Sequence, residues 1–558
     1  MKRWMLLGVF FLIACLAHAQ DITGDWQGTL DAGAKLRLVL HVTKAPDGSL
    51  KATMDSLDQA GANGIPVSSI SLKDAKLSLE LAIIQGKYEA KVAADGNSLS
   101  GTWTQQGQSF PLDFKRGAPK AVKPSDIDGA WMGTLDLGSI KLRVVFHIVS
   151  IEDGLTATLD SPDQGAKDIP TSSVTRDGSS LKIEVKKIEG AFDGKIAADV
   201  SSIDGTFTQM GGTHPLVLKR VKDEAELELK RPQNPVKPYP YRDEDVAYDN
   251  KVQNVTLAAT LTIPQGKGPF PAVVLITGSG PQDRDETLLG HKPFLVLSDY
   301  LTRHGIAVLR ADDRGTAKST GDFSTATTAD FATDTEAGIA YLKTRAEVDP
   351  HKIGLIGHSE GGVIAPMIAA RNKDVAFIVM MAGTGVPGDQ ILPAQGEAIE
   401  VAGGKSPEEA AKNAAKLREM LTLVETEKDA IILEKKLKEK MAGDVPEGQI
   451  GLQIKQLTSV WFRYFLTYDP AIALRKVTCP VLAINGSLDK QVLPSQNLSA
   501  IRKALAESGN QHVEVDELTG LNHLFQSAKT GSPAEYAQIQ ETMSPVALDK
   551  MATWIAKQ

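Results

Sequence analysis

Residues 352–362 read Lys-Ile-Gly-Leu-Ile-Gly-His-Ser-Glu-Gly-Gly, and this stretch is the strongest indication of how the second half of the chain folds. Its apolar start is typical of a buried parallel strand, and the Ala-rich residues 363–370 that follow are typical of a helix packed on a sheet. Between them lies Gly357-His358-Ser359-Glu360-Gly361, a Gly-x-Ser-x-Gly pattern. On a sharp turn from strand to helix this pattern lifts the Ser hydroxyl clear of the backbone, because bulkier residues two positions before or after the Ser would clash. Ser359 is therefore a candidate nucleophile, and the alternative is a Gly-rich turn with a solvent-facing Ser.

Strands and helices alternate on both sides of this stretch. Apolar strands are expected at residues 255–263, 271–276, 306–310, 375–381, 481–485 and 513–516. Helices are expected near residues 292–304, 329–345 and 545–557. This alternation, from residue 243 to the C-terminus, predicts a doubly wound parallel sheet with its active loops at the carboxyl ends of the strands.

A long segment of mostly helical pattern separates the strands at residues 375–381 and 481–485. Ser406-Pro407-Glu408-Glu409 is a good helix start within it, with Ser as the N-cap and Pro at the first helical position. An insertion at this edge of the sheet predicts a helical cap over the Ser turn, at about residues 386–475. Trp461 and Phe465 in this cap are candidates for lining an acyl pocket, and the alternative is that their aromatic cluster is simply core.

A Ser hydroxyl is a poor nucleophile at its ordinary pKa and needs a His that an acid holds in the right tautomer. Of the ten His in the chain, His512 and His523 lie downstream of the Ser turn. His512 opens the last strand, whereas His523 lies in the loop after it, at the active end of the sheet, so His523 is the predicted base. Asp489 follows the preceding strand and is the predicted acid, with Asp516 as the second choice.

The order Ser359, Asp489, His523 and the motif at residues 277–285 (Thr-Gly-Ser-Gly-Pro-Gln-Asp-Arg-Asp) resemble the α/β-hydrolase superfamily over residues 243–558. Within that superfamily, the motifs look most like a bacterial secreted esterase group close to the serine aminopeptidase-like hydrolases. The resemblance does not reach the first 242 residues.

The resemblance also implies an oxyanion hole made of two backbone amides. One is the amide after the nucleophile, here that of Glu360, and the other comes from the loop after the third strand, here that of Ser279, with Gly280 as the alternative. Two further features receive no chemical role. His358 adjoins the nucleophile on a turn that points its ring elsewhere, and Asp283-Arg284-Asp285 is expected to be a structural ion-pair loop rather than a group that orients substrate.

The first part of the chain contains an internal duplication. Asp-Ile-x-Gly-x-Trp-x-Gly-Thr-Leu begins at Asp21 and again at Asp126, and Lys-Arg closes each copy at Arg116 and Arg220. Alternating segments joined by Asp-Gly turns predict two all-β domains, sandwiches or small barrels, at residues 20–118 and 124–221. The repeated motifs resemble those of lipocalin- and avidin-like barrels. The repeated Trp, Trp26 and Trp131, are expected to be core residues.

The segments that flank the two copies are of a different kind. Residues 1–19 look like a secretory signal, with a basic start, an apolar run and an Ala-His-Ala cleavage site. We therefore expect export to the periplasm or the cell exterior, and the alternative is a lipoprotein anchored at Cys15. Cleavage leaves Cys479 as the one cysteine, so no internal disulfide is expected. Residues 222–242 hold several Pro among charged residues and predict an extended linker.

Composition excludes some classes of function. The net charge of −8 argues against a nucleic-acid partner, because nothing neutralises phosphates in bulk. No cluster of His, Cys and acidic residues shows metal-ligand spacing, so neither a metal nor another cofactor is expected.

Together the motifs predict a serine hydrolase that cleaves small-molecule carboxylic esters of short-to-medium acyl chains through a Ser-Asp-His triad and an acyl-enzyme. Two alternatives stay open. One is a serine peptidase or aminopeptidase that acts on short peptides. The other is a surface protein whose β repeats bind glycan, lipid or another cell-envelope component, with a vestigial hydrolase domain.

Overall fold

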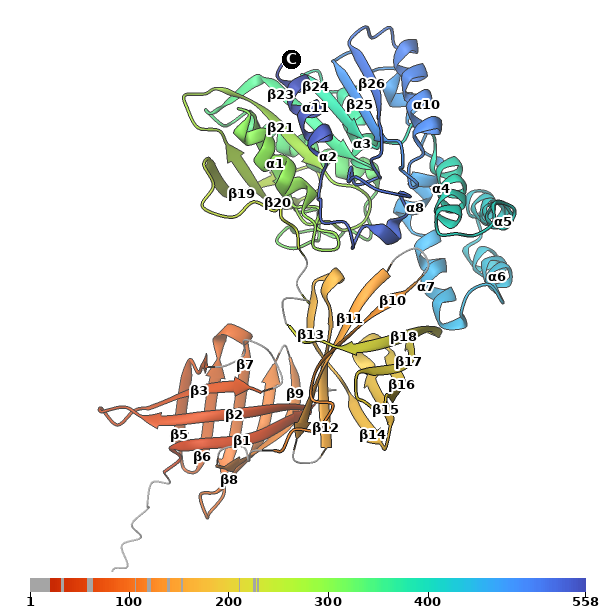
Figure 1. The fold of residues 1–558 in the computed structure, drawn as a ribbon. Coiled ribbons are helices and arrows are strands. Elements are labelled where there is room, and N and C mark those ends of the chain that lie inside the picture. Colours follow the sequence, from red (N-terminus) through yellow and green to blue (C-terminus); the bar gives the residue numbers. More distant parts are fainter. Residues whose placement is uncertain are drawn as a thin grey trace, which may run out of the picture. The chain divides into compact units, whose positions relative to one another are not determined.

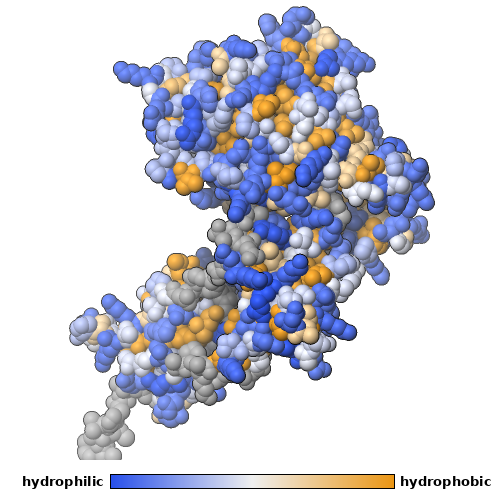
Figure 2. Space-filling view, viewed as in Figure 1, coloured by the Kyte–Doolittle hydropathy of each residue, from blue (hydrophilic) through white to orange (hydrophobic). Residues whose placement is uncertain are grey.

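The computed structural model describes residues 21–558 except residues 32–34, 58–63, 106, 118–121, 138–140, 152–153, 210, 224–226 and 228–229. The expected signal peptide at residues 1–19, with Cys15, lies outside the described residues. Two β domains precede an α/β domain along the chain (Figure 1). Hydrophilic side chains cover most of the face shown in Figure 2. Among the described residues, no helix has both the length and the apolar character needed to cross a bilayer.

An eight-stranded sheet organises the C-terminal domain, in the order β19-β20-β22-β21-β23-β24-β25-β26. Its strands are β19 (Arg242–Asn250), β20 (Val255–Ile263), β21 (Phe270–Ile276), β22 (Ala307–Ala311), β23 (Val348–His358), β24 (Phe377–Met381), β25 (Val481–Gly486) and β26 (Val513–Leu518). From β22 to β26 all neighbouring strands are parallel, and β20 pairs antiparallel with both β19 and β22. The doubly wound sheet predicted from the sequence is confirmed, with an antiparallel hairpin added at one edge.

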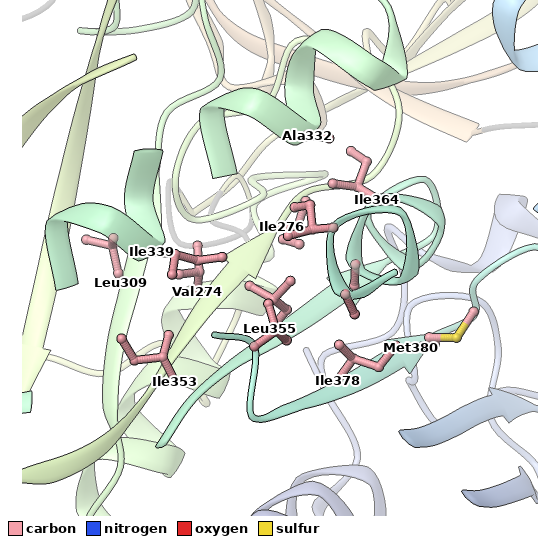
Figure 3. Close-up of a cluster of buried hydrophobic side chains, with 14 of the residues drawn as sticks. Val274, Ile276, Leu309, Ala332, Ile339, Ile353, Leu355, Ile364, Ile378 and Met380 are labelled. Carbon is pink, nitrogen blue, oxygen red and sulfur yellow. The ribbon is translucent and has the colours of Figure 1, made fainter. Parts of the chain in front are cut away.

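Helices cover both faces of this sheet (Figure 1). They are α1 (Pro293–Arg303), α2 (Thr328–Leu342), α3 (Gly361–Ala369), α10 (Pro494–Glu507) and α11 (Pro545–Ile555). Since side chains alternate along a strand, Val274 and Leu355 pack with Ile364 of α3 on one face (Figure 3), while the neighbours of these strand residues pack with α1 and α11 on the other. Burial on both faces is the physical reason that these strands read as continuous apolar runs.

The helical cap predicted between β24 and β25 is present. Its helices are α4 (Gly388–Ala402), α5 (Pro407–Thr426), α6 (Ala430–Met441), α7 (Glu447–Leu457), α8 (Val460–Thr467) and α9 (Ala471–Leu474). The Ser406 side chain accepts a hydrogen bond from the Glu409 amide, so α5 begins with the predicted N-cap. The cap has a core of its own, in which Leu421 and Val424 of α5 pack against Leu433 of α6 and Phe462 of α8.

The first β domain is an antiparallel sheet in the order β4-β3-β2-β1-β9-β8-β7-β6-β5. Its strands are β1 (Gly24–Asp31), β2 (Lys35–Lys44), β3 (Leu50–Ser56), β4 (Ile65–Pro66), β5 (Ser69–Lys73), β6 (Lys76–Leu81), β7 (Gly86–Val92), β8 (Ser98–Gln105) and β9 (Gln108–Arg116). Trp26 is fully buried, and the Arg116 guanidinium lies 4.4 Å from its ring centroid. Arg116 also donates to the carbonyl oxygens of Asp21 and Thr23, so the repeated Trp and Arg together fasten the N-terminal end of this sheet.

The second β domain has the order β11-β10-β18-β17-β16-β15-β14-β12-β13, which repeats that of the first copy from β11 to β14, and β12 also pairs with β11. Its strands are β10 (Gly129–Asp136), β11 (Lys141–Ile151), β12 (Gly154–Ser161), β13 (Ala166–Pro170), β14 (Ser173–Asp177), β15 (Ser180–Val185), β16 (Gly190–Ile196), β17 (Ser202–Gln209) and β18 (Gly212–Arg220). Arg220 lies 4.4 Å from the buried Trp131 ring, as in the first copy. Leu155 of β12 pairs with Val174 of β14, and since β11 also pairs with β12, this copy is a closed barrel, whereas the first copy is a half-barrel. Both predicted all-β domains are therefore confirmed.

The Pro-rich linker differs from the extended spacer expected over residues 222–242. Arg231 donates hydrogen bonds of 2.8–3.2 Å to the carbonyl oxygens of Leu289, Ala537 and Ile539. The Gln233 side-chain amide donates to the Met543 carbonyl oxygen, and its own oxygen accepts the Met543 amide. From Arg231 onward the segment is consequently fixed to the C-terminal domain, because its polar side chains satisfy backbone groups there.

Candidate active site

The predicted nucleophile lies on a strained turn between β23 and α3. Ser359 is partly exposed and has a φ of +52°, a left-handed conformation that non-Gly residues rarely adopt. Its amide donates to the Met381 carbonyl oxygen over 2.8 Å, which fixes the turn to β24. A Cβ at Gly357 would lie 1.9 Å from the Gly361 carbonyl oxygen, and one at Gly361 would lie 2.2 Å from that of Ile276. The two Gly of the motif are thus required by close backbone contacts, as expected for a nucleophile elbow.

The predicted base and acid are in direct contact. His523, in the loop after β26, places Nδ1 2.8 Å from Asp489 Oδ2, and both side chains are buried. The other Asp489 oxygen accepts the amides of Gln491 and Val492, at 2.8 and 2.9 Å. These bonds fix the carboxylate, which in turn holds a proton on His523 Nδ1 and leaves Nε2 to accept one.

The alternatives for these two roles lie elsewhere. Asp516 of β26 forms an ion pair with Lys550 of α11. His512 is exposed just before β26. His358 Nε2 lies 3.0 Å from the His523 carbonyl oxygen, so the elbow and the base loop touch one residue away from Ser359. In the described part of the chain, no hydrogen bond joins the Ser359 hydroxyl to His523.

The two predicted oxyanion amides flank the elbow. Glu360 is the residue before α3, and the N-terminal end of a helix favours negative charge. Ser279 follows β21 and is exposed, with Gly280 next to it at a φ of +93°. Gly278 donates its amide to Glu286 Oε1 over 2.9 Å, so that amide is already engaged. Within the described residues, the amides of Ser279 and Glu360 donate to no protein acceptor.

The Glu360 side chain is buried under the cap. Its Oε1 accepts hydrogen bonds from the Thr328 hydroxyl, at 2.6 Å, and from Trp461 Nε1, at 2.8 Å. Burial raises the pKa of Glu360 and outweighs the two hydrogen bonds, which lower it. From the sequence, Trp461 was expected to line a pocket or to be part of an aromatic core, because no motif indicates this contact between cap and elbow.

Phe465, the other residue expected to line an acyl pocket, packs on Trp461 and borders a small cavity. Its ring stacks on that of Trp461 with centroids 5.4 Å apart and an angle of 3° between the planes. It lines a cavity of about 10 Å³ together with Glu360, Val363 and Val386. Such a cavity holds about one water-sized group.

A second acid near the elbow, Asp313, is half-buried. Asp313 accepts hydrogen bonds from the Thr277 hydroxyl and the Gln282 amide, at 2.8 and 2.9 Å. Burial raises its pKa to about 8, and the negative charges of Glu360 and Glu286 act in the same direction. Asp313 and Glu360 line a cavity of about 40 Å³ beside Gly278.

The ion-pair loop expected at residues 283–285 is present, since Arg284 pairs with the buried Asp312 and Asp285 pairs with Arg310. The next residue, Glu286, was missed by the sequence analysis. Its carboxylate lies 2.9 Å from His358 Nδ1, so the His358 ring points into the domain beneath the elbow. Within the described residues, no group of three or more His, Cys, Asp or Glu is arranged to hold a metal ion.

Comparison with known proteins shows what this domain is similar to. Residues 253–517 match the family model described as X-Pro dipeptidyl-peptidase (S15 family). Esterase EstD of Thermotoga maritima is 29% identical over 323 residues, which cover 58% of this chain and 69% of that protein. The C-terminal half of this chain has the α/β-hydrolase fold and is similar to S15-family and esterase proteins. The superfamily that the motifs resembled is thereby confirmed for the α/β-hydrolase domain, and the family match does not include residues 21–252.

Solved structures similar to the α/β-hydrolase domain include two esterases. Esterase Pf2001 of Pyrococcus furiosus is 16% identical and covers 57% of this chain and 93% of its own, with a TM-score of 0.36. Est1E of Butyrivibrio proteoclasticus, solved with ferulic acid bound, is 19% identical and covers 56% of this chain and 98% of its own, with a TM-score of 0.34.

Proposed function

We propose that this protein is a serine hydrolase that cleaves carboxylic esters of short acyl chains, with Ser359, His523 and Asp489 as its catalytic triad. The observation that supports this most is the 2.8 Å hydrogen bond between His523 and Asp489, which lies beside the strained elbow of Ser359. The relationship to EstD, a protein described as an esterase, supports the same reaction class.

The geometry suggests how each group acts. His523 Nε2 takes the proton of the Ser359 hydroxyl as Oγ bonds to the ester carbonyl carbon, and Asp489 stabilises the imidazolium that forms. The amides of Ser279 and Glu360 donate to the oxygen that becomes negative. When the intermediate collapses, the carbon–oxygen bond to the alcohol breaks and His523 gives its proton to the departing oxygen. Water then attacks the acyl-enzyme by the same route and releases the acid and free Ser359.

The dimensions of the pocket favour the short end of the predicted range of acyl chains. The cavity that Phe465 lines beside Glu360 holds about 10 Å³, and its wall includes Val363 and Val386. A cavity of this size accepts about a methyl group without movement of the cap, because a methyl group is close in size to a water molecule. Acetyl and propionyl esters should therefore react faster than octanoyl esters, as kcat/KM for a series of p-nitrophenyl esters would show.

Labelling and substitution test the assignment of the triad. A fluorophosphonate should modify the protein once, on the peptide that contains Ser359, and S359A should abolish both labelling and turnover. H523A should lower kcat on the order of 10⁴-fold, and D489N by a similar or smaller factor. H512A is the matched control, since it removes the other downstream His, and it should leave kcat unchanged. Labelling at another Ser, or a damaging H512A with a mild H523A, would overturn the assignment.

A serine peptidase is the second candidate, and one observation favours it. The family model that matches residues 253–517 is described as an X-Pro dipeptidyl-peptidase. Both candidates use the same triad, so they are distinguished by the substrate and not by substitution of Ser359.

A further inference from the structure

Glu286 connects two loops of the active site. Its Oε1 accepts the Gly278 amide over 2.9 Å, directly before the proposed oxyanion residue Ser279. The same oxygen lies 2.9 Å from His358 Nδ1, directly before the nucleophile Ser359. Glu286 itself is held by the ion-pair loop, in which its amide donates to the Asp283 carbonyl oxygen over 2.9 Å.

His358 extends this connection to a third loop. Its Nε2 lies 3.0 Å from the carbonyl oxygen of His523, the proposed base, and the two rings have centroids 4.9 Å apart. A chain of direct contacts therefore runs from Gly278 through Glu286 and His358 to His523. At one end, Gly278 directly precedes Ser279 of the proposed oxyanion hole. At the other end, His523 is the proposed base.

The positions of the protons follow from the partners. A carbonyl oxygen only accepts, so His358 Nε2 must carry a proton. Nδ1 faces a carboxylate oxygen, so a second proton lies between Nδ1 and Glu286 Oε1. Both side chains are buried, at 6% and 5% exposure, and burial disfavours the imidazolium. Burial alone would lower the pKa of His358, but the charge and hydrogen bond of Glu286, the His523 carbonyl oxygen and the charge of Asp489 together raise it.

We propose that Glu286 and His358 form a positioning pair, which sets the oxyanion amide of Ser279, the nucleophile Ser359 and the base His523 at their working distances from one another. This inference rests on the proposed function, because it assigns the pair a role in that same site. The pair does not touch the reacting atoms, so its members are positioning residues. A charge-assisted hydrogen bond is stronger than a neutral one and is buried here, which suits it to hold three separate loops in register.

The test compares E286Q with D285N. E286Q keeps the shape of the side chain but removes the negative charge that favours the His358 imidazolium. A neutral His358 ring carries one N–H, so it can donate to only one of its two partners. D285N is the matched control, because Asp285 directly precedes Glu286 in the same loop. The substitution weakens the ion pairs with Arg310 and Lys292 and removes no contact with the elbow or the base loop. H358Q is the second variant, in case E286Q does not fold. For each protein we would measure kcat and KM on p-nitrophenyl acetate, the rate of fluorophosphonate labelling of Ser359, and the melting temperature.

E286Q and H358Q should lower kcat and the labelling rate by about 10- to 100-fold, since displacements of the order of 1 Å in a site have effects of that size. KM should stay within about threefold, because the pair does not contact substrate. D285N should keep kcat within about threefold although its melting temperature falls as far as that of E286Q. Proton NMR gives a further readout, because an imidazole proton donated to a carboxylate resonates far downfield. This resonance of His358 Nδ1 should be present in the wild type and in D285N and absent in E286Q.

Two results would overturn the positioning role. One is an E286Q variant whose kcat and labelling rate equal those of D285N. The other is a fall in the activity of E286Q that is fully explained by a smaller fraction of folded protein. If the wild type labels at Ser359 but cleaves no ester, the proposed function fails, while the labelling rates and the His358 resonance still decide the role of the pair.

Discussion

Trp461 Nε1 donates a 2.8 Å hydrogen bond to Glu360 Oε1, and this bond joins the helical cap to the nucleophile elbow. Trp461 belongs to α8, whereas Glu360 follows Ser359 directly and offers its amide to the proposed oxyanion hole. The bond ends on a buried carboxyl group, whose second donor is the Thr328 hydroxyl. The position of the cap and the position of one oxyanion donor are therefore coupled.

Substitution of Trp461 by Phe tests this coupling. W461F keeps a ring that can stack on Phe465 but removes the N–H, so a buried acceptor loses one of its donors, at a cost of about 1–3 kcal/mol. We expect kcat on a short ester to fall by about tenfold, since a displaced oxyanion amide stabilises the transition state less. W554F is the control, because Trp554 is a buried residue of α11 that packs against Phe377, and its kcat should stay near that of the wild type. Equal kcat values for the two variants would contradict the coupling.

Asp313 predicts a pH dependence of stability. Its pKa is about 8 in the folded protein and 3.8 ordinarily, so between these values the folded state binds the proton that the unfolded state has lost. The free energy of unfolding of the wild type should consequently fall as pH rises from about 4 to about 8. D313N carries no such proton, so its stability relative to the wild type should rise over this range, by on the order of 1 kcal/mol or more.

Urea unfolding of both proteins at pH 5 and pH 8 would measure this change. D313N also changes the hydrogen bonds from Thr277 and Gln282. Any loss of unfolding free energy from that change is present at both pH values, so it does not affect the comparison between them. D374N, at an exposed Asp that pairs with Lys343, is the control for a surface carboxylate. A stability difference between D313N and the wild type that does not change with pH would show that Asp313 is ionised throughout.

The sequence located the sheet and the residues proposed for the triad because both depend on patterns along the chain. Apolar runs mark buried strands, and the ends of parallel strands mark the active edge, so Ser359, Asp489 and His523 were placed before any contact was known. The Glu286–His358 pair could not be found in this way. Its members lie far apart in sequence, and which way a buried imidazole turns depends on the packing around it. Trp461 was a candidate pocket residue, but its hydrogen bond to Glu360 could not be predicted for the same reason, since a helical position does not show a hydrogen-bond partner.

The β repeats show another limit of the sequence. The duplication gave the number of domains and the core positions of Trp26 and Trp131, because both depend on repeated residues. Whether a copy closes depends on a single pairing, that of Leu155 with Val174 in the second copy. No periodicity in the sequence distinguishes the closed barrel from the half-barrel.

Truncation tests whether the β repeats are accessory. Every residue of the proposed mechanism lies beyond the linker, so a chain that begins at Lys230 should fold and cleave small soluble esters with an unchanged kcat. A chain that begins at Pro238 lacks Arg231 and Gln233 and their hydrogen bonds to the α/β-hydrolase domain, and we expect its melting temperature to be several degrees lower. Loss of kcat in a folded chain from Lys230 would show that the repeats complete the site. Losses confined to esters in cell-envelope material would support the predicted role of the repeats in binding.

The leaving group of the substrate distinguishes an esterase from a peptidase. An alkoxide or phenoxide leaves the tetrahedral intermediate with little help, whereas an amine must first be protonated by His523 in good geometry. Amide cleavage therefore makes stricter demands on substrate position, which peptidases meet by anchoring the peptide. The carboxyl groups nearest the elbow are poor anchors for a substrate amine. Glu360 is buried beneath Thr328 and Trp461, and Glu286 is engaged by Gly278 and His358.

We accordingly expect kcat/KM for p-nitrophenyl acetate to exceed that for aminoacyl and X-Pro p-nitroanilides by at least about 100-fold, a ratio that corresponds to roughly 2.7 kcal/mol of transition-state stabilisation. The two substrate classes release the same kind of chromophore, so they can be compared in one assay, with S359A as the blank for hydrolysis outside the site. Buried and already bonded carboxyl groups give an N-terminal amine nothing to bind, so adding a free α-amino group to the ester should not lower KM. An anilide that turns over as fast as the best ester, or an amino group that lowers KM tenfold, would make the peptidase the better description of this site.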